Sequence, residues 1–262
     1  MFFAAIIDNT PTLVIAIILL AAIFIFYLLG VRLGNYQKKH NPDAKAEGVG
    51  PLEGALLGLL ALLLSFTFSM SASRYDTRNS LITEEANDIA TVYLRAGLYP
   101  DSTRNLFRED LRQYVEARIA YYEVGNNRSK IDNALADAAV ISTHIWERAS
   151  SLSRGSSATI PHSLMVPAVN AMIDVVTSRD AARHARVPSS IFWLLILLTL
   201  LGSLIIGYSK KEKKNDWIVL TIYSLMTVIT IYTIIDLDRP RQGIIKTDTA
   251  HKKMVELREL FK

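Results

Sequence analysis

The chain has 262 residues, no cysteine and a formal net charge of +4. Without cysteine, disulfide frameworks, thiolate metal sites and cysteine nucleophiles are all excluded. Residues 74–187 carry 14 basic and 14 acidic side chains and are therefore neutral as a whole. A nucleic-acid-binding surface is not expected, because such surfaces need an excess of Lys and Arg.

Four stretches contain no Asp, Glu, Lys or Arg: residues 9–31, 54–73, 187–209 and 217–235, which are 23, 20, 23 and 19 residues long. About 20 apolar helical residues span the roughly 30 Å hydrocarbon core of a bilayer. We therefore predict an all-α membrane protein with four transmembrane helices in two hairpins that flank an extramembrane helical domain. The first stretch is expected to stay as an anchor, since residues 1–10 carry no Lys or Arg and its apolar run exceeds a signal-peptide core.

Breaker residues divide the chain into four parts. We predict a first hairpin at 1–73 with spans at about 11–33 and 52–73, a helical domain at 74–187, a second hairpin at 188–236 with spans at about 188–209 and 217–236, and a tail at 237–262 that packs on the helical domain. No breaker follows Ser73 until Gly97, so the second span should continue into the domain as one helical rod.

Three more helices are predicted in the domain. Asp101 or Ser102 should cap a helix that ends at Gly125. Ser129 and Asp132 resemble a capping box at the start of the next helix, which should end near Ser153.

The last domain helix should be interrupted near Pro167, and Pro188 should start the third span. Tyr93, Leu111, Tyr114 and Val169 are expected inside the domain.

Membrane orientation is left open by the charges. The loop after the first span carries Arg32, Lys38, Lys39 and Lys45, and residues 210–214 carry four lysines, which favours cytoplasmic loops and an outward domain. Seven arginines at the domain-side ends of the spans place positive charge on the opposite side of the membrane as well, so the charge difference between the two sides is small.

Small side chains recur along the second span at intervals of three or four, at Gly54, Gly58, Ala61, Ser65, Ser69 and Ala72. They fall on one helical face. Such a face is commonly a helix-packing seam. The alternative is a pore lining, in which Ser65 and Ser69 present hydroxyls to an ion and Phe68 narrows the path.

Four segments carry a resemblance to a known family. They are the exit motif Phe66-Thr67-Phe68-Ser69-Met70-Ser71-Ala72-Ser73-Arg74-Tyr75-Asp76-Thr77-Arg78, Glu84-Glu85-Ala86-Asn87, Leu94-Arg95, and the Asp-Leu-Asp-Arg-Pro-Arg-Gln-Gly stretch from Asp236 to Gly243. The chain resembles the bacterial bestrophin-like membrane protein family, and more distantly the bestrophin anion channels.

The resemblance implies a homo-oligomer, a pentamer in bestrophins, whose central pore for small inorganic ions is lined by the second span. It also implies the inner (plasma) membrane of a bacterium. The apolar collar of bestrophins superposes near Ala61, Ser65 and Ser69, which are small or polar here. The cytosolic domain of bestrophins disagrees with the orientation that the loop charges favour.

Three further sets of charged residues are candidates. Arg74, Asp76, Arg78 and Arg183 are pore-mouth candidates, and their basic groups would favour anions. Asp236, Asp238, Arg239 and Arg241 follow the last span as a salt-bridged helix exit or as a latch that holds the tail against a neighbour. Glu84, Glu85 and Asp88 lie at helical spacing, where carboxylates paired with arginines are commoner than a divalent cation site.

The favoured function is an oligomeric ion channel or conduit, with the lipid bilayer, small ions and other copies of the chain as partners. The alternative is a membrane-anchored sensor or scaffold whose helical domain binds a ligand or partner. No enzyme activity and no cofactor are expected, because no acid, base and nucleophile set and no metal-ligand spacing can be assembled from motifs.

Overall fold

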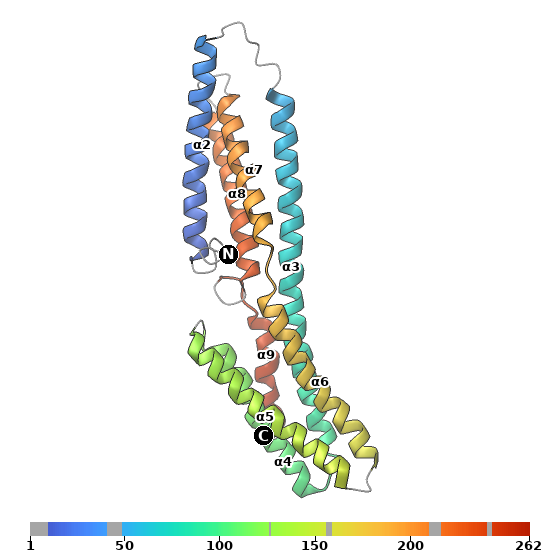
Figure 1. Cartoon of the computed structure of the whole chain (residues 1–262). Helices are drawn as coiled ribbons and strands as arrows, with labels where there is room; N and C mark the ends of the chain where they lie inside the picture. Colours follow the sequence, from blue (N-terminus) through green and yellow to red (C-terminus); the bar gives the residue numbers. More distant parts are fainter. Residues whose placement is uncertain (1–9, 41–48, 126, 156–158, 210–215, 240–242) are drawn as a thin grey trace. The chain divides into compact units, whose positions relative to one another are not determined.

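A computed structural model describes residues 10–40, 49–125, 127–155, 159–209, 216–239 and 243–262, which contain no β-strand (Figure 1). The helices are α2 (Thr12–His40), α3 (Val49–Ala96), α4 (Asp101–Glu123), α5 (Arg128–Gly155), α6 (Thr159–His184), α7 (Ser189–Tyr208), α8 (Asp216–Asp238), α9 (Asp248–Glu256) and the 3₁₀ helix η1 (Leu257–Phe261).

Four helical segments are long and apolar enough to cross a membrane. They are Thr12–His40 in α2, Gly50–Ala96 in α3, Pro161–Tyr208, which runs through α6 and α7, and Trp217–Asp238 in α8. The predicted fold class, an all-α membrane protein with two hairpins around a helical domain, is confirmed. The predicted rod is also present, since α3 runs from Val49 to Ala96 without interruption.

The ends of two domain helices differ from the prediction. Pro100 precedes α4 and its first residue is Asp101, with no side-chain cap, so neither Asp101 nor Ser102 has the predicted capping role. At α5 the cap is Asn127, whose Oδ1 accepts the backbone N–H of Lys130 at 3.1 Å. The predicted end at Gly125 is confirmed by its positive φ of 61°.

The predicted interruption at Pro167 is wrong, because α6 continues through this residue. A proline in a helix removes one hydrogen bond and crowds the preceding turn. Here Met165, Val169 and Met172 are fully buried around it. Burial of these side chains stabilises the continuous helix against the local cost of the proline.

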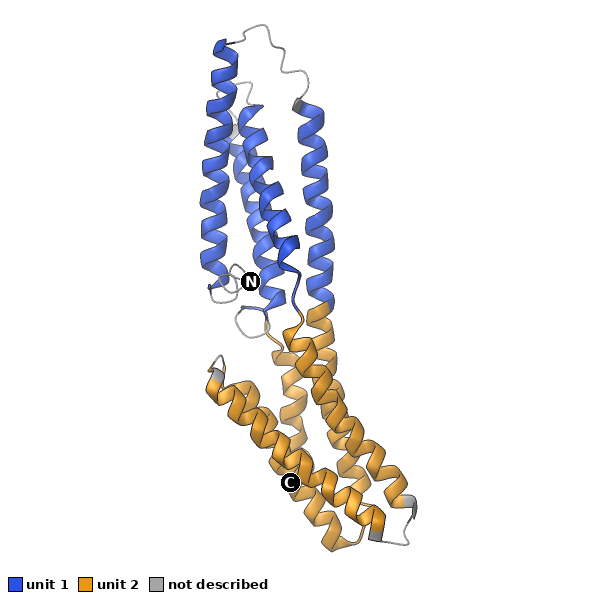
Figure 2. Ribbon diagram, viewed as in Figure 1, with its two compact units in different colours: residues 1–73, 186–245 blue, residues 74–185, 246–262 orange. Residues whose placement is uncertain are grey.

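The chain divides into two compact units, unit 1 with residues 1–73 and 186–245 and unit 2 with residues 74–185 and 246–262 (Figure 2). The core of unit 2 gathers side chains from α3, α4, α5, α6 and the tail, among them Ile89, Leu111, Tyr114, Val169 and Met254. Tyr93 packs on this core while partly buried.

In unit 1, helices α2 and α7 approach so closely that only small residues fit between them. A Cβ added at Gly30 would overlap the backbone of Leu204, and one at Gly207 would overlap the backbone of Tyr27. The Ser203 hydroxyl donates a hydrogen bond to the Ile23 carbonyl at 2.6 Å across the same contact. This is the small-residue packing that membrane helices use in place of hydrophobic burial.

Residues 246–262 of the tail belong to unit 2 and rest on α4. Arg258 donates two hydrogen bonds to Glu116, at 2.8 and 2.6 Å. His251 stacks on Tyr122 with ring centroids 3.7 Å apart. Met254 and Leu257 are buried in the core of the unit.

Candidate functional site

The membrane-spanning part of α3 has one side that packs inside unit 1. Leu60, Thr67 and Ser71 are buried on this side. Leu60 belongs to a cluster with Leu195 and Leu198 of α7. The packing side of α3 is therefore not the face on which the sequence places Gly54, Gly58, Ala61, Ser65, Ser69 and Ala72.

The small residues of α3 lie on an exposed side, and we call them the small-residue stripe: Gly54, Gly58, Ala61, Ser65, Ser69 and Ala72. All are exposed except Ala72, which is half-buried. A Cβ added at Gly54 or Gly58 would meet no other atom within 4 Å. Phe68 borders the stripe and is 41% exposed. The stripe is thus not a packing seam within the chain.

A second exposed side of α3 carries large apolar residues, which we call the large-residue stripe: Leu52, Leu59 and Phe66, each at least 47% exposed. With 3.6 residues per turn, this stripe lies between the small-residue stripe and the buried side. The exposed half of α3 therefore has two chemically different surfaces.

Of the pore-mouth candidates, Arg78 is 6% exposed. Its guanidinium donates hydrogen bonds to the carbonyls of Ala182 at 3.1 Å and Ala185 at 2.9 Å, where α6 ends. Positive charge is stabilising at the C-terminus of a helix. Arg183 forms an ion pair with Asp180 at 3.0 Å.

The other two pore-mouth candidates differ in exposure. Arg74 is half-buried, whereas the carboxylate of Asp76 lies on an exposed residue. Arg78 is therefore bound at the end of α6, whereas the Asp76 side chain, two residues earlier, is at the surface.

Among the three acidic candidates, Glu85 is fully buried in unit 2 and bound by arginines. Arg118 donates to both of its oxygens, at 2.6 and 2.9 Å, and Tyr114 donates at 3.1 Å. Arg179 completes the set with a further ion pair. Burial acts to raise the pKa of Glu85, but the charges of Arg179 and Arg118 outweigh it and hold the pKa below its usual value.

The neighbours of Glu85 are placed differently. Glu84 is exposed and Asp88 is half-buried. Burial and the charges of Glu84 and Glu85 raise the pKa of Asp88. Across the described ranges, no group of three or more His, Asp or Glu side chains could hold a metal ion.

The tail-latch candidates lie in unit 1, except Arg241, which falls outside the described residues. The Asp236 carboxylate accepts the backbone N–H groups of Ile244 at 3.1 Å and Ile245 at 2.8 Å. The Asp238 carboxylate accepts the N–H of Val187 at 3.1 Å, and Arg239 donates to the Thr10 carbonyl at 2.7 Å. These groups fix the chain just after α8 and just before α7.

Two structural features were missed by the sequence analysis. The α2–α7 seam has a sequence signal, because Gly30 and Gly34, like Ser203 and Gly207, are four residues apart. The arginine partners of Glu85 have no such sequence signal, because Arg118 and Arg179 lie 33 and 94 residues further along the chain.

Comparison with solved structures shows a common fold. A mutant of a bacterial bestrophin homolog from Klebsiella pneumoniae matches 91% of this chain and 98% of its own with a TM-score of 0.68 and 13% identity. A second mutant of that homolog matches 95% and 98% with a TM-score of 0.65 and 15% identity. A structure described as a membrane protein matches 91% and 96% with a TM-score of 0.62 and 14% identity.

Sequence comparison gives the family. No curated protein sequence matches the chain significantly. The family model of the bestrophin-like domain matches residues 15–251, which is most of the sequence. The chain therefore belongs to the bestrophin-like family.

Proposed function

We propose that the chain forms a homo-oligomeric ion conduit in which the small-residue stripe of α3 faces the central axis. The supporting observation is that this stripe is exposed in the single chain although it carries glycine, alanine and serine. The lipid-facing sides of other spans expose large apolar residues, such as Ile18 of α2 and Ile222 of α8. Membership of a family whose fold is known from ion channels supports the same function.

The large-residue stripe fits the oligomer as well. Four spans are too few to enclose a wide pore, so conduction needs several copies around an axis. The large-residue stripe would then contact a neighbouring copy or lipid, beside the axis-facing stripe. By resemblance to bestrophins we propose a pentamer. Native mass spectrometry of the purified protein tests this, and a strictly monomeric protein would remove the proposal.

The decisive experiment is ion flux in liposomes with Ser69→Trp. An indole at the axis should abolish flux while the oligomer stays intact, because it fills a lumen without entering a contact between copies. Leu59→Trp is the matched control, since Leu59 is also exposed on α3 but belongs to the large-residue stripe. If Ser69→Trp instead dissociates the oligomer, the stripe is an intersubunit seam and the conduit proposal fails.

The ion class is a separate proposal. The expectation of anions came from Arg74, Arg78 and Arg183. Arg78 is bound to helix carbonyls and Arg183 to Asp180, whereas Asp76 is exposed. This favours a second candidate, a cation conduit, because an acidic ring attracts cations.

Reversal potentials across a salt gradient distinguish the two ion classes. A cation conduit should prefer K⁺ or Na⁺ over chloride, and Asp76→Asn should reduce that preference. Glu84→Gln, a change at another exposed carboxylate of α3, is the matched control. Chloride preference in the unmodified protein would support the anion assignment instead.

A further inference from the structure

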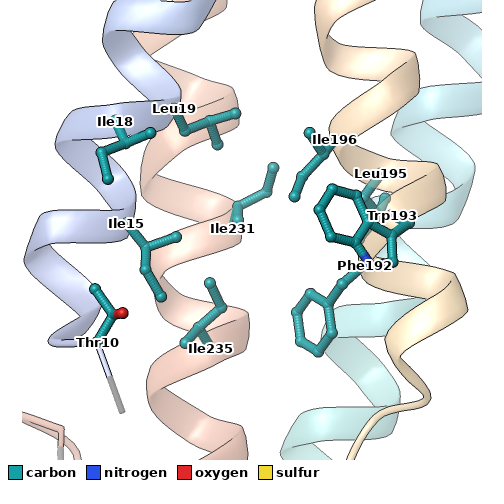
Figure 3. A pocket seen from close by; sticks show the side chains of 10 residues that line it. All are labelled: Thr10, Ile15, Ile18, Leu19, Phe192, Trp193, Leu195, Ile196, Ile231 and Ile235. Atoms are coloured by element: carbon teal, nitrogen blue, oxygen red, sulfur yellow. The ribbon is translucent and has the colours of Figure 1, made fainter. Parts of the chain in front are cut away.

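An apolar groove lies in the membrane-spanning bundle of unit 1 (Figure 3). Its walls come from α2, α7 and α8, and its volume is about 240 Å³. Leu195, Ile231 and Ile235 line it with less than 5% of each exposed, while Ile18 and Trp193 at its edge are 61% and 43% exposed. The groove is therefore deep but reached from the surface of the bundle.

The groove follows the direction of the helices. Its lining extends from Thr10, two residues before α2, to Leu19 of that helix. The seven helical steps from Thr12 to Leu19 alone correspond to about 10 Å. Apart from Thr10, every lining residue is apolar. Water in a buried site needs two to four polar partners. An occupant of this groove must therefore be apolar and elongated.

One end of the groove is polar. The carbonyl of Thr10, a lining residue, accepts a hydrogen bond from Arg239 at 2.7 Å. Asp238, three residues beyond the lining residue Ile235, holds Val187 through its carboxylate and Arg186 through its carbonyl. Arg186 is exposed. Trp193 lies in the second turn of α7, and amphipathic rings are enriched at membrane interfaces.

We propose that this groove binds one acyl chain of a bilayer phospholipid, with the phosphate at the Arg186 end. The chemistry matches in two parts, because the apolar slot accepts the hydrocarbon chain and the exposed guanidinium attracts the anionic head group. No lining residue comes from α3. The lipid site is therefore distinct from the small-residue stripe, and it does not depend on the proposed conduction.

Native mass spectrometry after extensive detergent exchange tests the site. The unmodified protein should retain one phospholipid per subunit, whereas Ile231→Phe should lose it. In Figure 3 the Ile231 side chain points across the groove towards Ile196, so an added ring occupies existing space rather than overpacking a filled core. Ile196→Phe fills the groove from the opposite wall and should give the same loss.

The matched control is Ile222→Phe, the same substitution at a residue of α8 that is 53% exposed and does not line the groove. It should keep the lipid. Equal lipid retention in Ile231→Phe, Ile196→Phe and the unmodified protein would overturn the proposal. If Ile231→Phe or Ile196→Phe changed the oligomer size without loss of lipid, the proposal would also be overturned, because the groove would then bind a second copy of the chain.

The head group is tested by offering phosphatidylglycerol and phosphatidylcholine at equal concentration. The unmodified protein should retain the anionic lipid preferentially, and Arg186→Gln should lose that preference while still binding one lipid. Equal retention of both lipids by the unmodified protein would overturn the placement of the phosphate at Arg186.

Discussion

Glycines in two parts of unit 1 occupy opposite environments. In the α2–α7 seam, a Cβ at Gly30 or Gly207 would overlap backbone atoms of the facing helix. On α3, a Cβ at Gly54 or Gly58 would meet nothing within 4 Å. Gly30 and Gly34 in the seam, like Gly54 and Gly58 on α3, have the four-residue spacing of membrane packing motifs. The comparison teaches that this spacing identifies a helical face suited to close packing. Only the structure shows whether another helix of the chain packs against that face.

The largest expected effect is that of Gly207→Leu. Its side chain would have to displace the backbone of Tyr27 and Val31, which cannot rotate away as a side chain can. Overpacking costs about 1 to 3 kcal/mol in well-packed cores, and occasionally more. We expect the variant to lose most of its folded protein, measured by size-exclusion chromatography and thermal unfolding. A variant as stable as the unmodified protein would contradict the seam.

Glu85→Gln tests a buried position on the same helix as the exposed stripe. The change leaves Arg118 and Arg179 around a neutral group, and breaking a buried ion pair costs about 3 to 5 kcal/mol. Glu84→Gln, at an exposed neighbour, should have little effect. Thermal unfolding at neutral pH measures both, and equal stability of the two variants would contradict the network.

The acid dependence of Glu85 has a defined sign. Since its pKa is lowered in the folded protein, its contribution to stability is present above the unfolded pKa of about 4.3 and is lost as the pH falls through the folded pKa. Unfolding curves at decreasing pH should show this loss in the unmodified protein. The loss should be smaller in Glu85→Gln.

Gly58→Leu tests the exposed glycines of α3. Since no atom of the chain lies near the added side chain, the fold of the subunit should be unchanged. If the stripe faces the axis of an oligomer, ion flux should fall or assembly should be disturbed. Flux and assembly equal to those of the unmodified protein would place the stripe against lipid.

The smallest expected effect comes from a pair of glycine-to-alanine changes. Gly54→Ala should stabilise the protein by about 0.5 to 1 kcal/mol, because alanine loses less backbone entropy in a helix and meets no obstacle here. Gly34→Ala should destabilise it, because the added methyl group meets the carbonyl oxygen of Tyr208 at 2.7 Å. Shifts of the melting temperature in opposite directions are expected, and shifts of the same sign would contradict the comparison.

The sequence was sufficient for features that depend on local pattern. Uncharged runs predicted the spans, and the absence of breakers after Ser73 predicted the continuous α3. Gly125 ended α4 as predicted because a positive φ suits glycine. These signals are carried by neighbouring residues and need no knowledge of distant contacts.

Features that depend on tertiary packing were not predictable in the same way. The helix through Pro167 is stabilised by buried neighbours that no local rule includes. The small residues of α3 could be identified, but whether they met another part of the chain could not be judged from spacing alone. The acidic residues at 84, 85 and 88 looked alike in sequence, and only Glu85 proved fully buried.

The Asp236 carboxylate has a consequence for amide hydrogen exchange. It accepts the N–H groups of Ile244 and Ile245, and it is 1% exposed whereas Ile244 is 80% exposed. An amide on so exposed a residue would ordinarily exchange with solvent quickly. Here both amides should exchange slowly, and because they depend on one carboxylate they should lose protection together. Exchange at two residues outside α8 would thus report when the end of that membrane helix opens.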